Sequence, residues 1–304
     1  MPDNIDPSRS TAADLNRKAF VRLGAGVTLL GPAAAVLAAG EEYGKPHPPI
    51  VSERDRDIYV SHVTLPRPDV ALPAYAAAPR KSTATTPGVV VCQHVWGVDA
   101  NIRDIVRRLA KTGYVAIAPA LYERFKDVPS GDGATDSKPF QALAAQLQDA
   151  QVDGDTAAGA AWIRQRVNAA EQQRPPKIGV IGFCGGGAIA LRASVDDPTF
   201  DAAVIFYGKV RCGQSNDGPI TDMALAYTDK IRVPLMGNYG ARDTGILPDD
   251  VREMSKRLTV PHDVKIYDEA GHAFFDDTRV SYVASAADDA WTRTLAWFTK
   301  YLAV

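Results

Sequence analysis

The sequence predicts an α/β fold in which helices cover both faces of a mostly parallel sheet. Short apolar runs typical of buried strands alternate with longer amphipathic stretches between residues 58 and 302. Such alternation is typical of parallel strands joined by crossover helices. One run ends in a glycine-rich turn, and polar residues with catalytic potential follow two others. The 304 residues, 46% hydrophobic and 23% charged, suit a globular chain whose main part is one α/β domain.

The first 40 residues differ in kind from the rest. A basic stretch at 16–22 precedes a weakly apolar run at 23–39 that ends in small residues, as in a secretory signal. The pair Arg17-Lys18 resembles a twin-arginine signal whose second arginine is replaced. We therefore predict a signal-like segment over 1–40 and export to the periplasm. The alternative is an amphipathic extension on a cytoplasmic enzyme. Glycines and a proline interrupt the apolar run and argue against a stable membrane span.

Residues 41–54 contain three prolines and are predicted as a linker, and residues 55–304 as the folded domain. Paired strands are expected at 58–65 and 70–78, and a buried strand at 87–93. A helix follows at 99–111, with residues 102, 105, 106 and 109 on one stripe. We then expect a strand at 114–119 and a loop at 123–139. The helical stretch predicted over 140–167 is interrupted near Gly154.

The second half continues the alternation. Strands are expected at 177–181, 202–207, 233–240 and 264–267, a loop at 209–222, a helix at 249–258 and a final helix at 282–302. In the final helix Trp291, Leu295 and Phe298 share one face. No internal repeat is present in the sequence.

The most informative motif is Gly-Phe-Cys-Gly-Gly at 182–186, between the strand at 177–181 and a helical stretch beginning at 188. Strand, Gly-x-nucleophile-x-Gly and helix form the nucleophile elbow of α/β-hydrolases, here with a thiol. Glycines flank Cys184 because bulky neighbours clash in such a strained turn. The helix N-terminus favours a thiolate there. The alternative is a glycine-rich turn around a buried, inert cysteine.

A cysteine nucleophile needs a base, and the base needs an orienting acid. In this fold the chain order is nucleophile, acid, histidine. Asp243 follows the strand at 233–240, and His272 follows the strand at 264–267. The carboxyl ends of parallel strands open on one edge of the sheet, so the three side chains can meet there. Taken singly, Asp243 is also a plausible turn residue and His272 a loop residue.

With these motifs the chain resembles the dienelactone hydrolases (carboxymethylenebutenolidases), which are cysteine-dependent α/β-hydrolases. The resemblance extends over residues 55–303 and rests on the segments 89–98, 102–110, 113–124, 182–187, 206–208 and 271–275. It implies a Cys184–His272–Asp243 triad acting on ester or lactone carbonyls. It also implies an oxyanion hole formed by the backbone N–H groups of Val95 and Gly185.

The resemblance further implies that Arg124 contacts a substrate carboxylate. The second arginine of the family pattern is missing, because Asp276 stands near its place, and Arg279 is the nearest substitute. Aromatic pocket walls are expected from Tyr122, Trp96, Phe125, Tyr207 and Phe274, each of which could equally be ordinary core.

His94 stands where the family carries a glutamate that holds the thiol before substrate arrives. Two interpretations stay open for this substrate-site position. His94 is either a loop histidine with a structural hydrogen bond, or one half of a Cys–His pair whose imidazolium stabilises the thiolate.

Charge, histidine and cysteine content argue against a nucleic-acid partner, a metal or cofactor site and a disulfide framework. The net charge of −2 and the lack of a basic stripe argue against nucleic acid as a partner. The five histidines are scattered, so neither a metal site nor another cofactor is expected. Cys92 lies in an apolar strand and Cys212 in a loop, and no disulfide framework is predicted.

We therefore expect a hydrolase that cleaves a small ester or lactone through an acyl-thioester, as a monomer or weak homo-oligomer. Two alternatives remain. One is a general carboxylesterase or thioesterase of the same fold. The other is an exported, non-catalytic small-molecule-binding protein that keeps the pocket.

Overall fold

The computed structural model describes residues 49–167, 175–195, 199–211 and 224–303. The predicted signal-like segment, most of the predicted linker and Cys212 lie outside the described residues.

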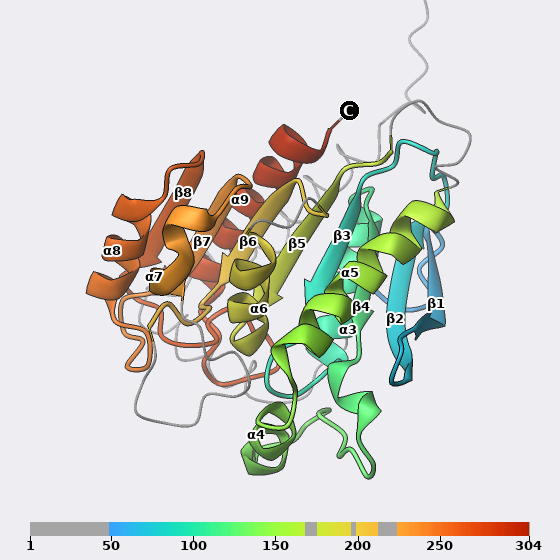
Figure 1. The fold of residues 1–304 in the computed structure, drawn as a ribbon, viewed down its shortest axis with the longest axis horizontal. Helices are drawn as coiled ribbons and strands as arrows, with labels where there is room; N and C mark the ends of the chain where they lie inside the picture. Colours follow the sequence, from blue (N-terminus) through green and yellow to red (C-terminus); the bar gives the residue numbers. More distant parts are fainter. Residues whose placement is uncertain (1–48, 168–174, 196–198, 212–223, 304) are drawn as a thin grey trace, which may run out of the picture. The chain divides into compact units, whose positions relative to one another are not determined.

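In the described residues eight strands form one sheet in the order β1-β2-β4-β3-β5-β6-β7-β8 (Figure 1). Their bounds are β1 (Ile58–Pro66), β2 (Ala71–Pro79), β3 (Gly88–Cys92), β4 (Val115–Pro119), β5 (Ile178–Phe183), β6 (Ala202–Phe206), β7 (Leu235–Gly240) and β8 (His262–Tyr267). β2 runs antiparallel to both β1 and β4, and the other neighbouring pairs are parallel. Every position of β3 to β7 is buried. The predicted α/β fold with a mostly parallel sheet is therefore confirmed.

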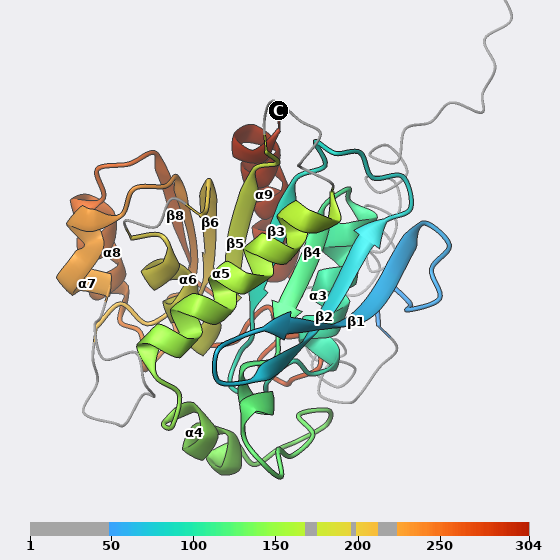
Figure 2. The same cartoon turned by 45° about the vertical axis from the view of Figure 1, so that its right-hand side comes forward.

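Helices cover both faces of this sheet. α5 (Asp149–Arg166) and α6 (Gly185–Ala193) lie on one face, and α3 (Ala100–Lys111) and α9 (Ala284–Leu302) on the other (Figures 1 and 2). Shorter elements complete the domain: η2 (Leu121–Arg124), α4 (Lys138–Ala144), α7 (Ala224–Tyr227), η4 (Thr228–Lys230) and α8 (Pro248–Arg257). The predicted apolar stripe of α3, at 102, 105, 106 and 109, is fully buried. None of the described helices is long and apolar enough to cross a membrane.

The helical stretch predicted over 140–167 is two helices, and the break predicted near Gly154 is wrong. The chain breaks at residues 145–148, where the side chain of Gln151 accepts the Gln148 N–H at 3.1 Å and caps α5. Gly154 lies inside α5, and a Cβ there would come within 1.8 Å of the Arg67 guanidinium. The glycine leaves room for Arg67 to reach Asp155, with Nε and Oδ1 2.8 Å apart.

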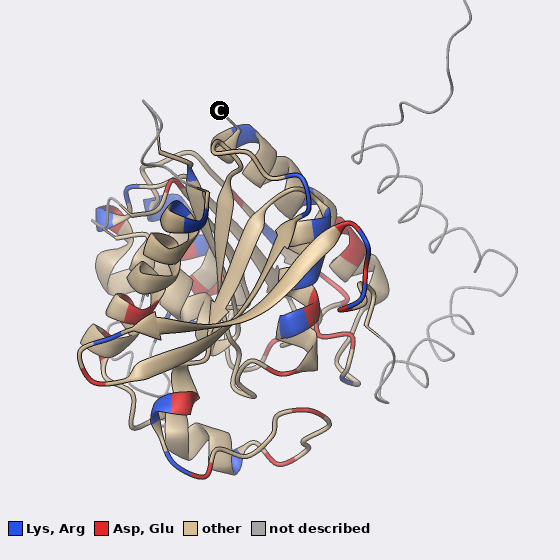
Figure 3. Ribbon diagram, turned by 90° about the vertical axis from the view of Figure 1, so that its right-hand side faces the viewer, with Lys and Arg blue, Asp and Glu red and all other residues tan. Residues whose placement is uncertain are grey.

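α3 also carries buried charges that hold two distant segments. Asp104 is 2% exposed and accepts the backbone N–H groups of Val51 at 2.8 Å and Ile50 at 3.1 Å. Arg108 donates to Asp104 at 2.7 Å and also pairs with Asp277. Because Asp277 lies a few residues past His272, this pair fixes the loop after β8 to α3. Charged residues elsewhere gather on helices and loops, and the central strands are almost free of them (Figure 3).

Candidate active site

The structure brings Cys184, Asp243 and His272 together at the carboxyl edge of the sheet, the lower edge in Figure 1. They follow β5, β7 and β8 respectively. His272 Nε2 lies 3.1 Å from Cys184 Sγ, and His272 Nδ1 lies 2.7 Å from Asp243 Oδ2. Three side chains that are far apart in sequence thus form one hydrogen-bonded chain.

The turn that carries Cys184 is strained. Cys184 has φ 55° and ψ −118° at the N-cap of α6. A Cβ at Gly182 would come within 1.8 Å of Gly186 O, and a Cβ at Gly186 within 2.2 Å of Cys92 O. Both flanking glycines are therefore required by close backbone contacts, as expected for a nucleophile elbow.

Strain also concentrates next to the histidine. Among the described residues, four other than glycine have a positive φ, and three of them are Cys184, Tyr207 (40°) and Ala273 (59°). Tyr207 is buried, and its ring centroid lies 5.2 Å from that of His272. Non-glycine residues in this backbone region are costly and cluster at functional sites. The strained backbone positions therefore lie at or next to the hydrogen-bonded Cys184 and His272.

The pKa values of the thiol and the imidazole are shifted in opposite directions. Burial would raise the pKa of Cys184, but the hydrogen bond and charge of His272, the charge of His94 and the Gly185 N–H together lower it. Burial would lower the pKa of His272, but Asp243 and Cys184 outweigh this and raise it to about 10. These directions favour a thiolate–imidazolium pair.

Backbone hydrogen bonds hold Asp243 at the Nδ1 side of the imidazole. Its side chain is 2% exposed, and Oδ1 accepts the N–H groups of Gly245 at 2.8 Å and Ile246 at 3.0 Å. Oδ2 is left to accept the proton on His272 Nδ1. This contact fixes the ring with Nε2 toward the sulfur.

The predicted oxyanion donors lie on two neighbouring turns. Residues 94–97 form a tight turn in which Gly97 donates to His94 O at 3.1 Å. The Val95 N–H makes no hydrogen bond to any described residue. The Gly185 N–H is the first of α6, and it helps to lower the pKa of the Cys184 thiol. Since Gly186 packs against the backbone of residues 92 and 93, the two turns are adjacent and leave donors for an oxyanion.

His94 is buried and tied into the same turn. Nδ1 accepts the Trp96 N–H at 3.2 Å, and Nε2 lies 3.2 Å from Asp99 and 4.0 Å from Asp276. Burial would lower the pKa of His94, but these carboxylates and Cys184 outweigh it and raise the pKa. The structural hydrogen bond is therefore present, and it requires an unprotonated Nδ1. The imidazolium form, whose charge would lower the pKa of Cys184, would have to give up this hydrogen bond. Each of the two interpretations has an observation in its favour.

Arg124, which is predicted to contact a substrate carboxylate, pairs with two carboxylates of the protein itself. The Arg124 side chain is 4% exposed, and its guanidinium pairs with Asp69 and Asp155. The substitute Arg279 is also engaged: its guanidinium lies 3.8 Å above the Trp96 ring and donates to backbone carbonyls of the 125–137 loop. Sequence alone could not reveal these partners because most lie far away along the chain.

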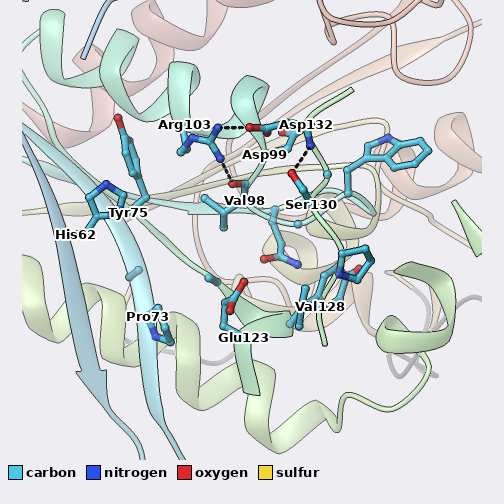
Figure 4. Close-up of a pocket in the computed structure, with 18 of the residues that line it drawn as sticks. His62, Pro73, Tyr75, Val98, Asp99, Arg103, Glu123, Val128, Ser130 and Asp132 are labelled. Atoms are coloured by element: carbon cyan, nitrogen blue, oxygen red, sulfur yellow. Dashed lines mark hydrogen bonds and ion pairs between the residues drawn. The ribbon is translucent and has the colours of Figure 1, made fainter. Parts of the chain in front are cut away.

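A cavity of about 440 Å³ lies between β1, β2, the 94–99 turn and the 120–132 loop (Figure 4), and none of Cys184, Asp243 and His272 lines it. Trp96 and Tyr122 line it as predicted, whereas Tyr207 does not. Phe274 is fully buried core, and neither it nor Phe125 lines the cavity. Gln93 also lines the cavity and was not predicted from the sequence, although it directly follows β3 and precedes the 94–97 turn. No group of three or more metal-binding side chains was found among the described residues.

The comparisons with known proteins identify the family of the chain. The sequence model of the dienelactone hydrolase family matches residues 72–302. The chain belongs to the dienelactone hydrolase family.

Relatives in this family cover most of the chain. An Escherichia coli protein named "Putative carboxymethylenebutenolidase" is 36% identical over 255 residues, covering 83% of this chain and 91% of its own. A Synechocystis protein of the same name is 36% identical and covers 81% and 98%. The crystal structure of a "Putative Dienelactone Hydrolase" from Klebsiella pneumoniae is 34% identical with a TM-score of 0.70, covering 80% and 99%. This dienelactone hydrolase family member is thus an ester hydrolase with an α/β-hydrolase fold.

Proposed function

We propose that the protein hydrolyses a small ester or lactone through Cys184, His272 and Asp243, with an acyl-thioester intermediate. The observation that carries the proposal is the chain of contacts from Cys184 Sγ through the His272 ring to Asp243, at 3.1 and 2.7 Å. Nucleophile, base and orienting acid stand in the order that covalent acyl transfer requires.

In the acylation half-reaction the Cys184 thiolate attacks the carbonyl carbon and forms a C–S bond. The carbonyl electron pair moves to oxygen, where the N–H groups of Val95 and Gly185 stabilise it. Loss of one such donor typically lowers the rate by about 10² to 10³. As the tetrahedral intermediate collapses, the C–O bond breaks and His272 Nε2 donates its proton to the leaving alkoxide.

In the deacylation half-reaction the neutral His272 takes a proton from water, which attacks the thioester carbonyl. Collapse breaks the C–S bond, frees the acid and restores the thiolate–imidazolium pair. Asp243 stabilises the imidazolium in both halves and keeps Nε2 directed at the reacting atoms. The sum is ester plus water giving acid plus alcohol.

The test is turnover of p-nitrophenyl acetate, with mass spectrometry of the acid-quenched enzyme. We expect an acetyl group on Cys184 and no turnover by Cys184→Ala. Cys92→Ala is the matched control, because burial raises the pKa of Cys92 to about 12 and makes it unreactive. Full activity of Cys184→Ala would refute the proposal. Binding without turnover by the wild type would favour the non-catalytic alternative.

We further propose that residues 1–40 direct export and are then removed. The sequence pattern of a basic stretch, an apolar run and a small-residue end supports this. Protein recovered from the periplasm of the source cell should begin near Gly40 or Glu41 on N-terminal sequencing. Active cytoplasmic protein with an intact N-terminus would contradict it.

A further inference from the structure

We infer that Arg279 is a positioning residue that holds the turn at 94–97 in line with the loop that carries His272. The inference rests on the proposed function, because it concerns the alignment of the Val95 N–H with the catalytic base. It gives Arg279 a role inside the protein framework and no contact with the substrate.

A short hydrogen-bonded segment connects the base to Arg279. Two consecutive turns span it: the Asp276 N–H donates to Ala273 O at 3.1 Å, and the Arg279 N–H donates to Asp276 O at 3.1 Å. Phe274, inside the first turn, is fully buried. Because Ala273 directly follows His272 in the chain, this segment places Arg279 at a fixed position relative to the imidazole.

The Arg279 side chain reaches from this segment to Trp96 in the turn. Its guanidinium carbon lies 3.8 Å from the centroid of the Trp96 ring, and Phe140 meets the same ring in a T-shaped contact with centroids 5.4 Å apart. The guanidinium also donates to two backbone carbonyls of the 125–137 loop. Trp96 directly follows Val95, so holding the ring from two sides restrains the peptide that carries the Val95 N–H.

Two buried carboxylates, one from each segment, share the same basic partners. Asp99 lies just after the turn, Asp276 lies in the histidine loop, and both are 3% exposed. Arg279 Nη2 is 3.8 Å from Asp99, and Arg279 Nε is 3.6 Å from Asp276. His94 Nε2 lies 3.2 Å from Asp99 and 4.0 Å from Asp276. Burial raises the pKa of Asp276 and the charge of Asp99 raises it further. Without Arg279 the two carboxylates would repel and separate the turn from the loop.

Turnover and alkylation of the thiol depend differently on this alignment. Ester cleavage moves negative charge onto the carbonyl oxygen, and loss of one donor such as the Val95 N–H lowers the rate by about 10² to 10³. Alkylation by iodoacetamide forms a C–S bond as iodide leaves, and no charge develops on a carbonyl oxygen. It needs only the Cys184 thiolate, which His272 stabilises. His272 keeps its 2.7 Å contact with Asp243, so the turn is the part that moves.

The experiment measures kcat/KM for p-nitrophenyl acetate and the rate of alkylation by iodoacetamide in Arg279→Met. We expect kcat/KM to fall by about tenfold or more, while the alkylation rate stays within about twofold of the wild type. This ester carries no carboxylate, so the loss cannot come from a missing contact with a substrate anion. Arg252→Met, at an exposed position of α8, is the matched control and should leave both rates unchanged.

An unchanged kcat/KM in Arg279→Met would overturn the inference. Equal losses in turnover and alkylation would also overturn it, because the variant would then have lost the site as a whole. If this variant does not fold, Arg279→Lys serves instead. It keeps a charge between the carboxylates but lacks the planar guanidinium that stacks on Trp96. Its turnover should fall severalfold at an unchanged alkylation rate, and wild-type turnover would overturn the inference.

A double variant tests the shared carboxylates. Asp276→Asn removes the charge that faces Asp99, so in combination with Arg279→Met there is no repulsion left between turn and loop. The loss of kcat/KM in the double variant should therefore be smaller than the product of the two single losses. A loss equal to that product would show that Arg279 does not act between these carboxylates and would overturn the inference.

Cys184→Ala, assayed alongside, keeps the two proposals apart. Full activity of Cys184→Ala would refute the proposed function. Loss of activity in Cys184→Ala together with wild-type turnover in Arg279→Met would overturn only the positioning role.

Discussion

Replacing His272 by glutamine should return the pKa of Cys184 toward that of a free thiol. In the wild-type protein the imidazolium Nε2 lies 3.1 Å from the sulfur. At an effective dielectric constant of about 20, charges at that distance attract by about 5 kcal/mol. The His272 side chain is 41% exposed, so solvent screening reduces this to about 2 kcal/mol. The loss should raise the pKa of Cys184 by about 1.5.

The Cys184 pKa should rise because the imidazolium stabilises only the ionised form of the thiol. The imidazolium stabilises the thiolate, so at a given pH the wild type holds a larger fraction of Cys184 as thiolate than the variant does. Alkylation by iodoacetamide should therefore be slower in His272→Gln, by up to about 30-fold at a pH where both thiols are mostly protonated. The two proteins should converge at high pH, where both thiols are ionised.

The assay is the ultraviolet absorbance of the thiolate against pH, with Cys184→Ala as the blank. His262→Gln, at an exposed position on β8, is the matched control and should titrate like the wild type. An unchanged Cys184 titration in His272→Gln would show that the 3.1 Å contact carries no ion pair, and the electrostatic reasoning would be wrong.

Three further predictions use matched variants. The Cys184 pKa should rise from the wild type to His94→Gln, because the His94 charge helps to lower it, and should rise further in His94→Glu, because a third carboxylate would join Asp99 and Asp276; equal pKa values in the wild type and His94→Gln would leave His94 a purely structural residue. Gly186→Ala should lower the free energy of unfolding by about 3 kcal/mol or more, because its Cβ would come within 2.2 Å of Cys92 O. Gly185→Ala, where a Cβ meets nothing within 4 Å, should unfold in urea like the wild type, and equal losses would contradict the close-contact argument. Asp104→Ala should cost about 3 to 5 kcal/mol because it leaves two backbone N–H groups without their acceptor and removes one of the two carboxylate partners of the buried Arg108; a loss no larger than that of the exposed Asp249→Ala would show that this buried cluster does not stabilise the fold.

The sequence by itself determined the features that depend on local patterns. Strand and helix periodicity placed the elements of the sheet within a few residues of their observed bounds. The glycines around Cys184 marked the elbow, because only small residues fit a backbone that passes so close to itself. The order of Cys184, Asp243 and His272, each after its own strand, predicted their meeting at one sheet edge, since parallel strands share that edge. The roles of the three residues in catalysis remain a proposal.

Only the tertiary structure decided the partners of the remaining side chains. The sequence suggests that Arg124 is a free cation beside the site. In the structure its guanidinium pairs with Asp69 and Asp155, each more than 30 positions away along the chain. His94 acquires its second carboxylate from Asp276 on a distant loop. The break predicted near Gly154 is wrong because this glycine makes room for Arg67 from another segment. The role of a charged side chain or a glycine depends on the residues that pack against it. Long-range contacts determine those residues, and a local sequence pattern does not reveal them.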